Sequence, residues 1–100
     1  MKYNKLVRDK IPEILDKKGL KYKVHFADKK EYWEKLKEKL SEEIKEFSEN
    51  ESVEEFADIS EVLSAIRKFK KFDKRKIESI KKNKAKERGG FKKRIILEES

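Results

Sequence analysis

Two pairs of acidic side chains have the spacing of neighbours on one helix face. The first pair is Glu43 and Glu46, and the second is Glu55 and Asp58. Residues three apart on a helix have their Cβ atoms about 5–6 Å apart. Carboxylate oxygens are the ligands that hard divalent cations such as Mg²⁺ and Mn²⁺ prefer. If the two helices are antiparallel neighbours, these four carboxylates can surround one or two such ions.

Ordinary helix chemistry is the alternative interpretation of the same acids. Glu55 lies in a first helical turn, where acids favour the positive end of the helix dipole. Lys39 and Lys45 can pair with the first two acids on a solvated surface. Two features favour a metal site instead. With about 100° of rotation per helical residue, Glu43 falls at the edge of the apolar stripe of its helix, and Asp58 lies on the same side of the next helix as several apolar residues. A carboxylate is costly to bury at such positions unless a cation neutralises it.

The acids lie on the two central segments of four that have helical patterns. The first helix is expected from about Asp9, as a possible N-cap, to Gly19, with Pro12 in its first turn. The second is expected to open at Asp28, with Glu31 three residues on. Its apolar residues fall on one arc of about 80°, as in a helix that faces a core. They are Trp33, Leu36, Leu40, Ile44 and Phe47.

The third helix is expected to begin at Ser52, whose hydroxyl and Glu55 form a capping box. Its apolar residues lie nearly all the way round, which predicts a central helix covered on several sides. Asp73 is expected to cap a lysine-rich fourth helix that ends at Gly89 and Gly90. The predicted fold is a single all-α domain over residues 1–100, with about four helices. Residues 94–97 are a short strand candidate that can pair with residues 3–7 in a terminal β ribbon.

The amino-acid composition excludes some kinds of functional site and favours others. The chain has 100 residues, half of which are charged, and a net charge of +8. It has no cysteine, so disulfides, thiolate metal sites and thiol catalysis are excluded. Neither a membrane-spanning run nor a signal-like segment is present, and we expect a soluble cytoplasmic protein. The central residues 28–64 are acidic and both flanks are basic. This distribution suits a metal site surrounded by phosphate-binding groups better than a plain DNA-binding surface.

Three motifs in order resemble a known family. The acidic motifs, together with the segment from Tyr3 to Pro12 and the run from Arg88 to Phe91, are similar to the MazG-like all-α nucleoside triphosphate pyrophosphohydrolases, and in particular to their phosphoribosyl-ATP-pyrophosphohydrolase-like subgroup. The resemblance covers nearly the whole chain. One departure is that only eight residues separate Glu46 from Glu55, which leaves a tight turn and little loop to cover a base.

The resemblance implies an activity and assigns roles to residues. It implies Mg²⁺-dependent hydrolysis between the α- and β-phosphates of a nucleoside triphosphate or a phosphoribosyl-ATP-like substrate, giving a monophosphate and pyrophosphate. Glu43, Glu46, Glu55 and Asp58 would be the metal ligands, with Mn²⁺ as a possible substitute for Mg²⁺. Glu46 or Glu43 would act as the general base. Members of the family usually form homodimers or homotetramers, and the thin core of this chain fits such an assembly.

Basic side chains near both ends are candidates for binding substrate phosphates. They are Lys5, Arg8, Lys10 and Arg88. The alternative is surface charge, with a helix stop at Gly89 and Gly90, and we expect the lysines from Lys81 to Lys86 to be solvated. Trp33 is expected to pack in the core rather than stack on a base, and His25 is not expected to be catalytic.

Two other functions remain open. The lysine-rich fourth helix can serve a nucleic-acid-binding module, whose affinity would fall steeply with salt. A catalytically silent family member that binds nucleotide as an oligomer is the other alternative, since all four acids would be present in it too. The sequence does not identify the base or sugar of a substrate.

Overall fold

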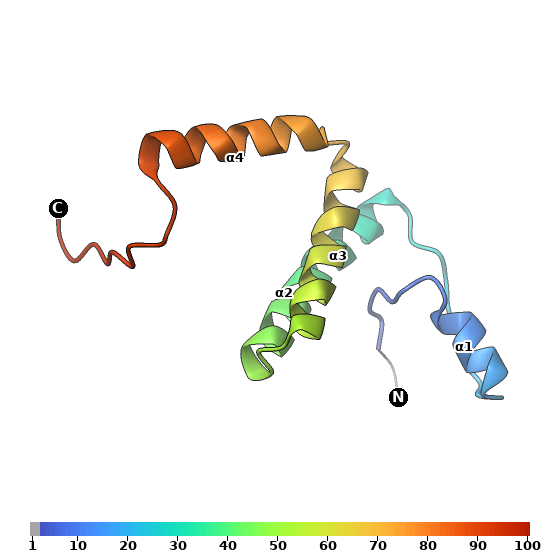
Figure 1. Cartoon of the computed structure of the whole chain (residues 1–100). Helices are drawn as coiled ribbons and strands as arrows, with labels where there is room; N and C mark the ends of the chain where they lie inside the picture. Colours follow the sequence, from blue (N-terminus) through green and yellow to red (C-terminus); the bar gives the residue numbers. More distant parts are fainter. Residues whose placement is uncertain (1–2) are drawn as a thin grey trace.

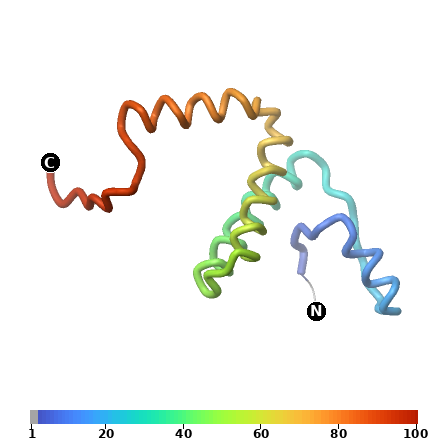
Figure 2. Tube along the Cα trace, in the orientation of Figure 1, coloured from blue at the N-terminus to red at the C-terminus, as the bar shows by residue number. Residues whose placement is uncertain are grey.

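The computed structural model describes residues 3–100 and consists of four helices (Figure 1). They are α1 (Ile11–Lys17), α2 (Lys29–Glu49), α3 (Val53–Lys70) and α4 (Lys74–Arg88). The predicted all-α class is therefore confirmed. Residues 3–7 and 94–97 form no strand, and the tube in Figure 2 places these two segments in different parts of the molecule, so the suggested terminal ribbon is not formed.

Three of the helices begin at the caps that the sequence predicts. The carboxylate of Asp28 accepts a hydrogen bond from the backbone N–H three residues on, at 2.8 Å. The Ser52 hydroxyl accepts from the N–H of Glu55 at 3.2 Å. The carboxylate of Asp73 accepts from the N–H two residues on, at 2.9 Å. Such caps satisfy amide groups that have no partner inside the helix, so these residues define where α2, α3 and α4 start.

The expectation for the start of the first helix is wrong. Helix α1 begins at Ile11, its N-cap is Lys10, and no side chain caps it, so Asp9 lies outside the helix. Pro12 does lie in the first turn, as predicted. Proline is accepted there because its missing N–H would have no helical partner. The turn at residues 9 and 10 is instead closed by the backbone, with the N–H of Ile11 donating to the carbonyl of Arg8 at 3.1 Å.

Helices α2 and α3 form an antiparallel hairpin joined by residues 50–52 (Figure 1). At the open end of the hairpin, the rings of Trp33 and Phe69 stack with centroids 5.8 Å apart. Near the turn, Phe47 meets Phe56 edge-on at 6.0 Å. Trp33 therefore packs against α3, as predicted. These contacts fix the register of the hairpin, and this register places the C-terminal turns of α2 opposite the first turns of α3.

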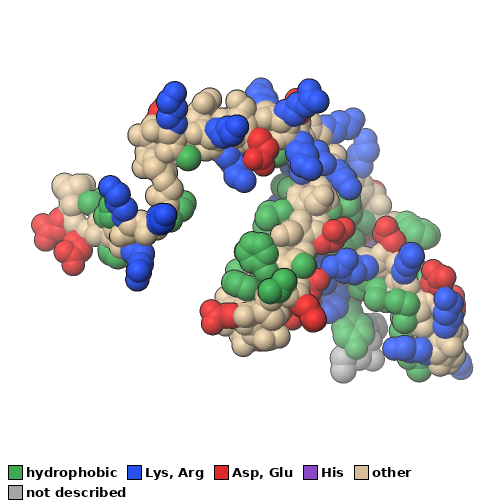
Figure 3. Space-filling model, viewed as in Figure 1, with side chains coloured by type: hydrophobic (Ala, Val, Ile, Leu, Met, Phe, Trp, Pro, Cys, Tyr) green, Lys and Arg blue, Asp and Glu red, His purple; other side chains and the backbone are tan. Residues whose placement is uncertain are grey.

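Within residues 3–100 of a single chain, the hydrophobic surface of α3 is covered mainly on the side that faces α2. Val62 of α3 is buried, as is Leu36 of α2, which is 1% exposed. Other apolar side chains are open to solvent, with Val53 86%, Phe56 60% and Leu63 49% exposed. Hydrophobic side chains are visible on the surface of the hairpin in Figure 3. The prediction that α3 is covered on several sides is thus not met by one chain, because α1 and α4 do not pack along it.

Helix α4 and the residues after it extend away from the hairpin (Figure 1). Lys71, with φ of 58°, ends α3 in a left-handed conformation, and α4 then leads off in another direction (Figure 1). The radius of gyration is 18.0 Å, compared with about 13 Å for a compact domain of 100 residues. The solvent-accessible surface is 10039 Å², whereas a compact monomer of this mass exposes about 6,000 Å². Across residues 3–100, no helix has the length and apolar character needed to span a membrane.

Candidate metal centre

Three of the four predicted metal ligands converge between α2 and α3. Glu43 of α2 and Glu55 and Asp58 of α3 each offer one carboxylate oxygen, and these oxygens all lie within 4.8 Å of one another. The spacing of three puts Glu55 and Asp58 on one face of α3, and the antiparallel hairpin turns that face toward Glu43. We call Glu43, Glu55 and Asp58 the acidic cluster.

Burying the carboxylates of the acidic cluster costs free energy unless a cation neutralises them. Glu43 is only 6% exposed, and Glu55 and Asp58 are half-buried. One oxygen each of Glu43 and Glu55, Oε2 in both, is shielded from solvent and has no hydrogen-bond partner among residues 3–100. Buried polar groups in folded proteins normally have partners, and an unpaired one costs about 1–3 kcal/mol, more when it is charged. Oxygen atoms this close together, with free lone pairs, fit a hard divalent cation.

Glu46 lies at the edge of the acidic cluster. Desolvation raises its pKa above the ordinary value, and the negative charge of Glu43 and a hydrogen bond with Glu43 raise it further. The charges of Glu42 and Glu55 act in the same direction. Glu46 therefore shares the electrostatic environment of the acidic cluster without being one of its three converging carboxylates. A half-buried carboxyl with a raised pKa is better suited to accept a proton than a fully solvated one.

Two basic side chains contact the acidic cluster, and a third pairs with the neighbouring Glu42. Lys39 Nζ lies 3.3 Å from Glu43 Oε1, one turn earlier on α2. Arg8 Nη2 donates to Asp58 Oδ1 at 2.8 Å, across 50 positions of the sequence. Lys5 Nζ lies 3.1 Å from Glu42 Oε1. Two predicted phosphate-binding residues, Lys5 and Arg8, are thus beside the acids.

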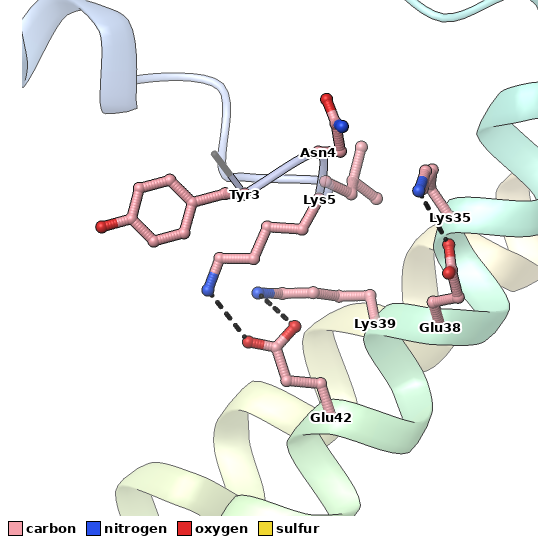
Figure 4. Close-up of a pocket in the computed structure, with 8 residues that line it drawn as sticks. Tyr3, Asn4, Lys5, Lys35, Glu38, Lys39 and Glu42 are labelled. Carbon is pink, nitrogen blue, oxygen red and sulfur yellow. Dashed lines mark hydrogen bonds and ion pairs between the residues drawn. The ribbon is translucent and has the colours of Figure 1, made fainter. Parts of the chain in front are cut away.

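Glu42 connects the N-terminal segment to α2. Lys5 and Lys39 both point their ammonium groups at its carboxylate, at 3.1 and 3.5 Å (Figure 4). Partial burial alone would raise the pKa of Glu42, but the hydrogen bond from Lys5 and the charges of Lys39 and Lys5 lower it overall. The neighbouring hollow has a volume of about 190 Å³. It is lined by Tyr3, Asn4, Lys5, Leu6, Lys35, Glu38, Lys39 and Glu42.

The other two predicted phosphate-binding residues lie elsewhere. Lys10 is exposed at the start of α1, and Arg88 is exposed at the last residue of α4, the helix that leads away from the hairpin (Figure 1). In the described part of the chain neither side chain makes an ion pair. A single chain therefore brings Arg8 to the acidic cluster and Lys5 to the neighbouring Glu42, and it leaves Lys10 and Arg88 apart from them.

Residues outside the candidate centre have structural contacts. Phe69 is contacted edge-on by Tyr32 at 5.2 Å, in addition to its stack with Trp33, and Lys70 lies 4.1 Å from the Trp33 ring centroid. His25 Nε2 lies 3.0 Å from the carboxylate of Glu31. The basic residues from Lys81 to Lys86 are exposed on α4, in line with the expectation of solvated surface.

Sequence reasoning found the acids but missed the long-range ion pairs. Lys39 and Glu43 are four apart on one helix, a spacing that signals their contact. The pairing of Arg8 with Asp58 and of Lys5 with Glu42 has no local signal, because the partners are 50 and 37 positions apart. Only the docking of the N-terminal segment against the hairpin brings them together.

Comparison with known proteins identifies no relative of this chain. The chain gives no significant match to a family model, to a curated protein or to a solved structure.

Proposed function

We propose that this protein is a Mg²⁺-dependent nucleotide pyrophosphohydrolase that cleaves between the α- and β-phosphates of a nucleoside triphosphate or a phosphoribosyl-ATP-like substrate. The observation that supports this most is the acidic cluster, in which Glu43 and Glu55 hold buried oxygens that have no partner in the described part of the chain. A divalent cation is the simplest group that satisfies these oxygens. The resemblance of the acidic motifs and of the segment from Tyr3 to Pro12 to the MazG-like enzymes supplies the reaction.

Each part of the site has a role in this reaction. Glu43, Glu55 and Asp58 would hold the ion, with Glu46 completing the set from the edge of the cluster. A bound Mg²⁺, or Mn²⁺ in its place, would polarise the phosphate and lower the pKa of water. Glu46 takes the proton of the attacking water, because it lies beside the acidic cluster and is not one of the three carboxylates that converge there. Water adds to one phosphorus, the bridging P–O bond breaks, and the products are a monophosphate and pyrophosphate.

The test is pyrophosphate release from a panel of nucleoside triphosphates and phosphoribosyl-ATP, with and without Mg²⁺. We expect release that requires the metal and falls at least about 100-fold in Glu43→Gln and Asp58→Asn, because each removes a metal ligand. Glu34→Gln is the matched control, since Glu34 is an exposed acid on α2 that pairs with Lys37 at 3.3 Å. Failure to release pyrophosphate from any member of the panel, while metal and nucleotide bind, would favour the catalytically silent alternative.

We also propose that the protein works as a homodimer or homotetramer. The chain exposes about 4,000 Å² more than a compact monomer of its mass, and permanent interfaces bury areas of about 2,000–5,000 Å². Phe56, on the uncovered side of α3, is 60% exposed. In sedimentation equilibrium we expect an oligomer that Phe56→Ser weakens and that Leu20→Ser, a change at a 54% exposed position outside the hairpin, leaves intact. A wild-type monomer at micromolar concentration would contradict the proposal.

Helix α4 gives some support to nucleic-acid binding as a second candidate function. Its exposed side chains are mostly basic, and the helix extends free of the hairpin (Figure 3). Binding of duplex DNA or RNA that weakens steeply with salt and needs no Mg²⁺ would support this function. Glu43→Gln should leave such binding unchanged, because Glu43 lies in the hairpin. That insensitivity separates the two functions.

A further inference from the structure

We propose that Arg8 is a resident counter-ion of the acidic cluster, which a divalent metal ion displaces when it binds. The inference rests on the proposed metal centre but not on the hydrolytic reaction. It identifies the segment of residues 3–8, which we call the strap, as a metal-responsive part of the molecule. The strap lies against the hairpin through Leu6, which is half-buried, and through the ion pairs of Lys5 and Arg8.

The geometry places the Arg8 guanidinium where it competes with a metal. Its Nη2 is 2.8 Å from Asp58 Oδ1, and Asp58 offers one of the three oxygens that lie within 4.8 Å of one another. Glu43 provides an independent sign that a cation belongs there, because its side chain is only 8% exposed and its Oε2 has no partner within residues 3–100. Arg8 thus neutralises one acid of the cluster and leaves the buried oxygens of Glu43 and Glu55 unsatisfied.

Charge balance explains why a metal would replace Arg8. The acidic cluster has three negative charges, and Arg8 and Lys39 together supply two positive charges. One divalent ion supplies the same charge at about 2.1 Å from its ligands, closer than the 2.8 and 3.3 Å of the two ion pairs. Because Coulomb attraction grows as distance shortens, the ion is the stronger partner for these carboxylates.

Lys39 and Arg8, the two basic side chains paired with the acidic cluster, differ in the number of their ion-pair partners. Lys39 also contacts Glu42, at 3.5 Å, so it keeps a partner if it leaves Glu43. The Arg8 side chain is 61% exposed, and its ion pair with Asp58 is its one ion pair in the described chain. Arg8 can therefore swing into solvent when a metal takes Asp58. A guanidinium released beside a bound metal is well placed to receive an anionic substrate, for which Arg8 was a sequence candidate.

Metal affinity tests the competition directly. Binding of Mn²⁺ to the full chain, followed by electron paramagnetic resonance of the free ion, gives a Kd without any need for activity. We expect Arg8→Ala to bind Mn²⁺ about two- to five-fold more tightly than the wild type, since exposed ion pairs are weak competitors. The matched control is Lys17→Ala, which removes an exposed ion pair with Glu13 on α1 and should leave Kd unchanged. Arg8→Lys should restore most of the wild-type Kd.

A spectroscopic readout follows the displacement itself. The ¹⁵N resonances of the Arg8 guanidinium, assigned by their loss in Arg8→Lys, should shift to those of a solvated arginine when Mg²⁺ saturates the protein. Tighter Mn²⁺ binding in Arg8→Ala together with this shift supports the proposal. Unchanged or weaker binding in Arg8→Ala overturns the displacement while leaving the metal centre in place. No Mn²⁺ binding to either protein overturns both, and metal binding without pyrophosphate release overturns the hydrolase alone.

Discussion

Replacing Glu43 by glutamine should affect stability in opposite directions with and without Mg²⁺. The change removes one charge from a buried side chain and keeps its size. The cluster oxygens lie within 4.8 Å of one another, so at an effective dielectric constant of about 20 the repulsions of Glu43 with Glu55 and with Asp58 are each at least about 3.5 kcal/mol. Lys39, at 3.3 Å, attracts Glu43 by about 5 kcal/mol on the same scale.

The repulsions together exceed the attraction by about 2 kcal/mol before Arg8 is counted. Arg8, whose guanidinium lies beside Asp58 and whose side chain is 61% exposed and therefore strongly screened, offsets part of this difference, and so does solvent screening at the half-exposed acids. We therefore expect metal-free Glu43→Gln to be more stable than the wild type by about 1 kcal/mol. Mg²⁺ at about 100 times its Kd adds about 2.7 kcal/mol to the wild type, which raises Tm by about 10 °C or more for a domain of this size. Glu43→Gln should lose most of that increase, because it removes the most buried of the three ligands.

Thermal unfolding followed by far-ultraviolet circular dichroism, in chelator and in millimolar Mg²⁺, measures both effects. The order of the two melting temperatures should reverse between the two conditions. Glu34→Gln, on the exposed side of α2, should have the same melting temperature as the wild type in chelator and in Mg²⁺. The reasoning fails if Glu43→Gln melts below the wild type in chelator, since Glu43 would then serve mainly as the partner of Lys39. It fails equally if Mg²⁺ raises the Tm of both proteins by the same amount.

Three further predictions concern single side chains. The raised pKa of Glu46, caused by desolvation and then by Glu43, means that its contribution to metal-free stability is present below the ordinary value of 4.5 and is lost as pH rises through the raised pKa. Melting temperatures in chelator should therefore fall over this range, and Glu46→Gln should flatten the profile. Ser52→Ala should cost about 1 kcal/mol in urea unfolding, because it removes the cap of α3. Trp33→Ala should cost about 3 kcal/mol by the same assay, because it removes the stack on Phe69. An unchanged urea midpoint in Ser52→Ala or in Trp33→Ala would contradict the prediction for that variant.

Local patterns in the sequence predicted much of the hairpin. Caps such as Asp28 and Ser52 were predictable because a side-chain oxygen and a backbone N–H two or three residues away meet through local geometry alone. The same holds for the helical spacing that puts Glu55 beside Asp58. The start of α1 was not predictable from Asp9, since a backbone turn closes that segment and the acid has no capping contact.

Contacts between distant segments decided the rest. Which of the acids are buried depends on the register of α2 against α3, and this register is set by aromatic contacts such as Trp33 with Phe69. The position of Arg8 depends on how the strap lies against the hairpin, which helical periodicity does not encode.

The sequence by itself thus determined the four helices, the caps of α2, α3 and α4, and the pairing of acids along each helix, because these depend on residues within one or two turns of each other. Only the tertiary structure decided that Glu43, Glu55 and Asp58 converge, that Glu43 is buried, and that Arg8 neutralises Asp58. These features depend on where distant parts of the chain pack, and the free energies of packing and of charge burial are set by the neighbours that folding supplies.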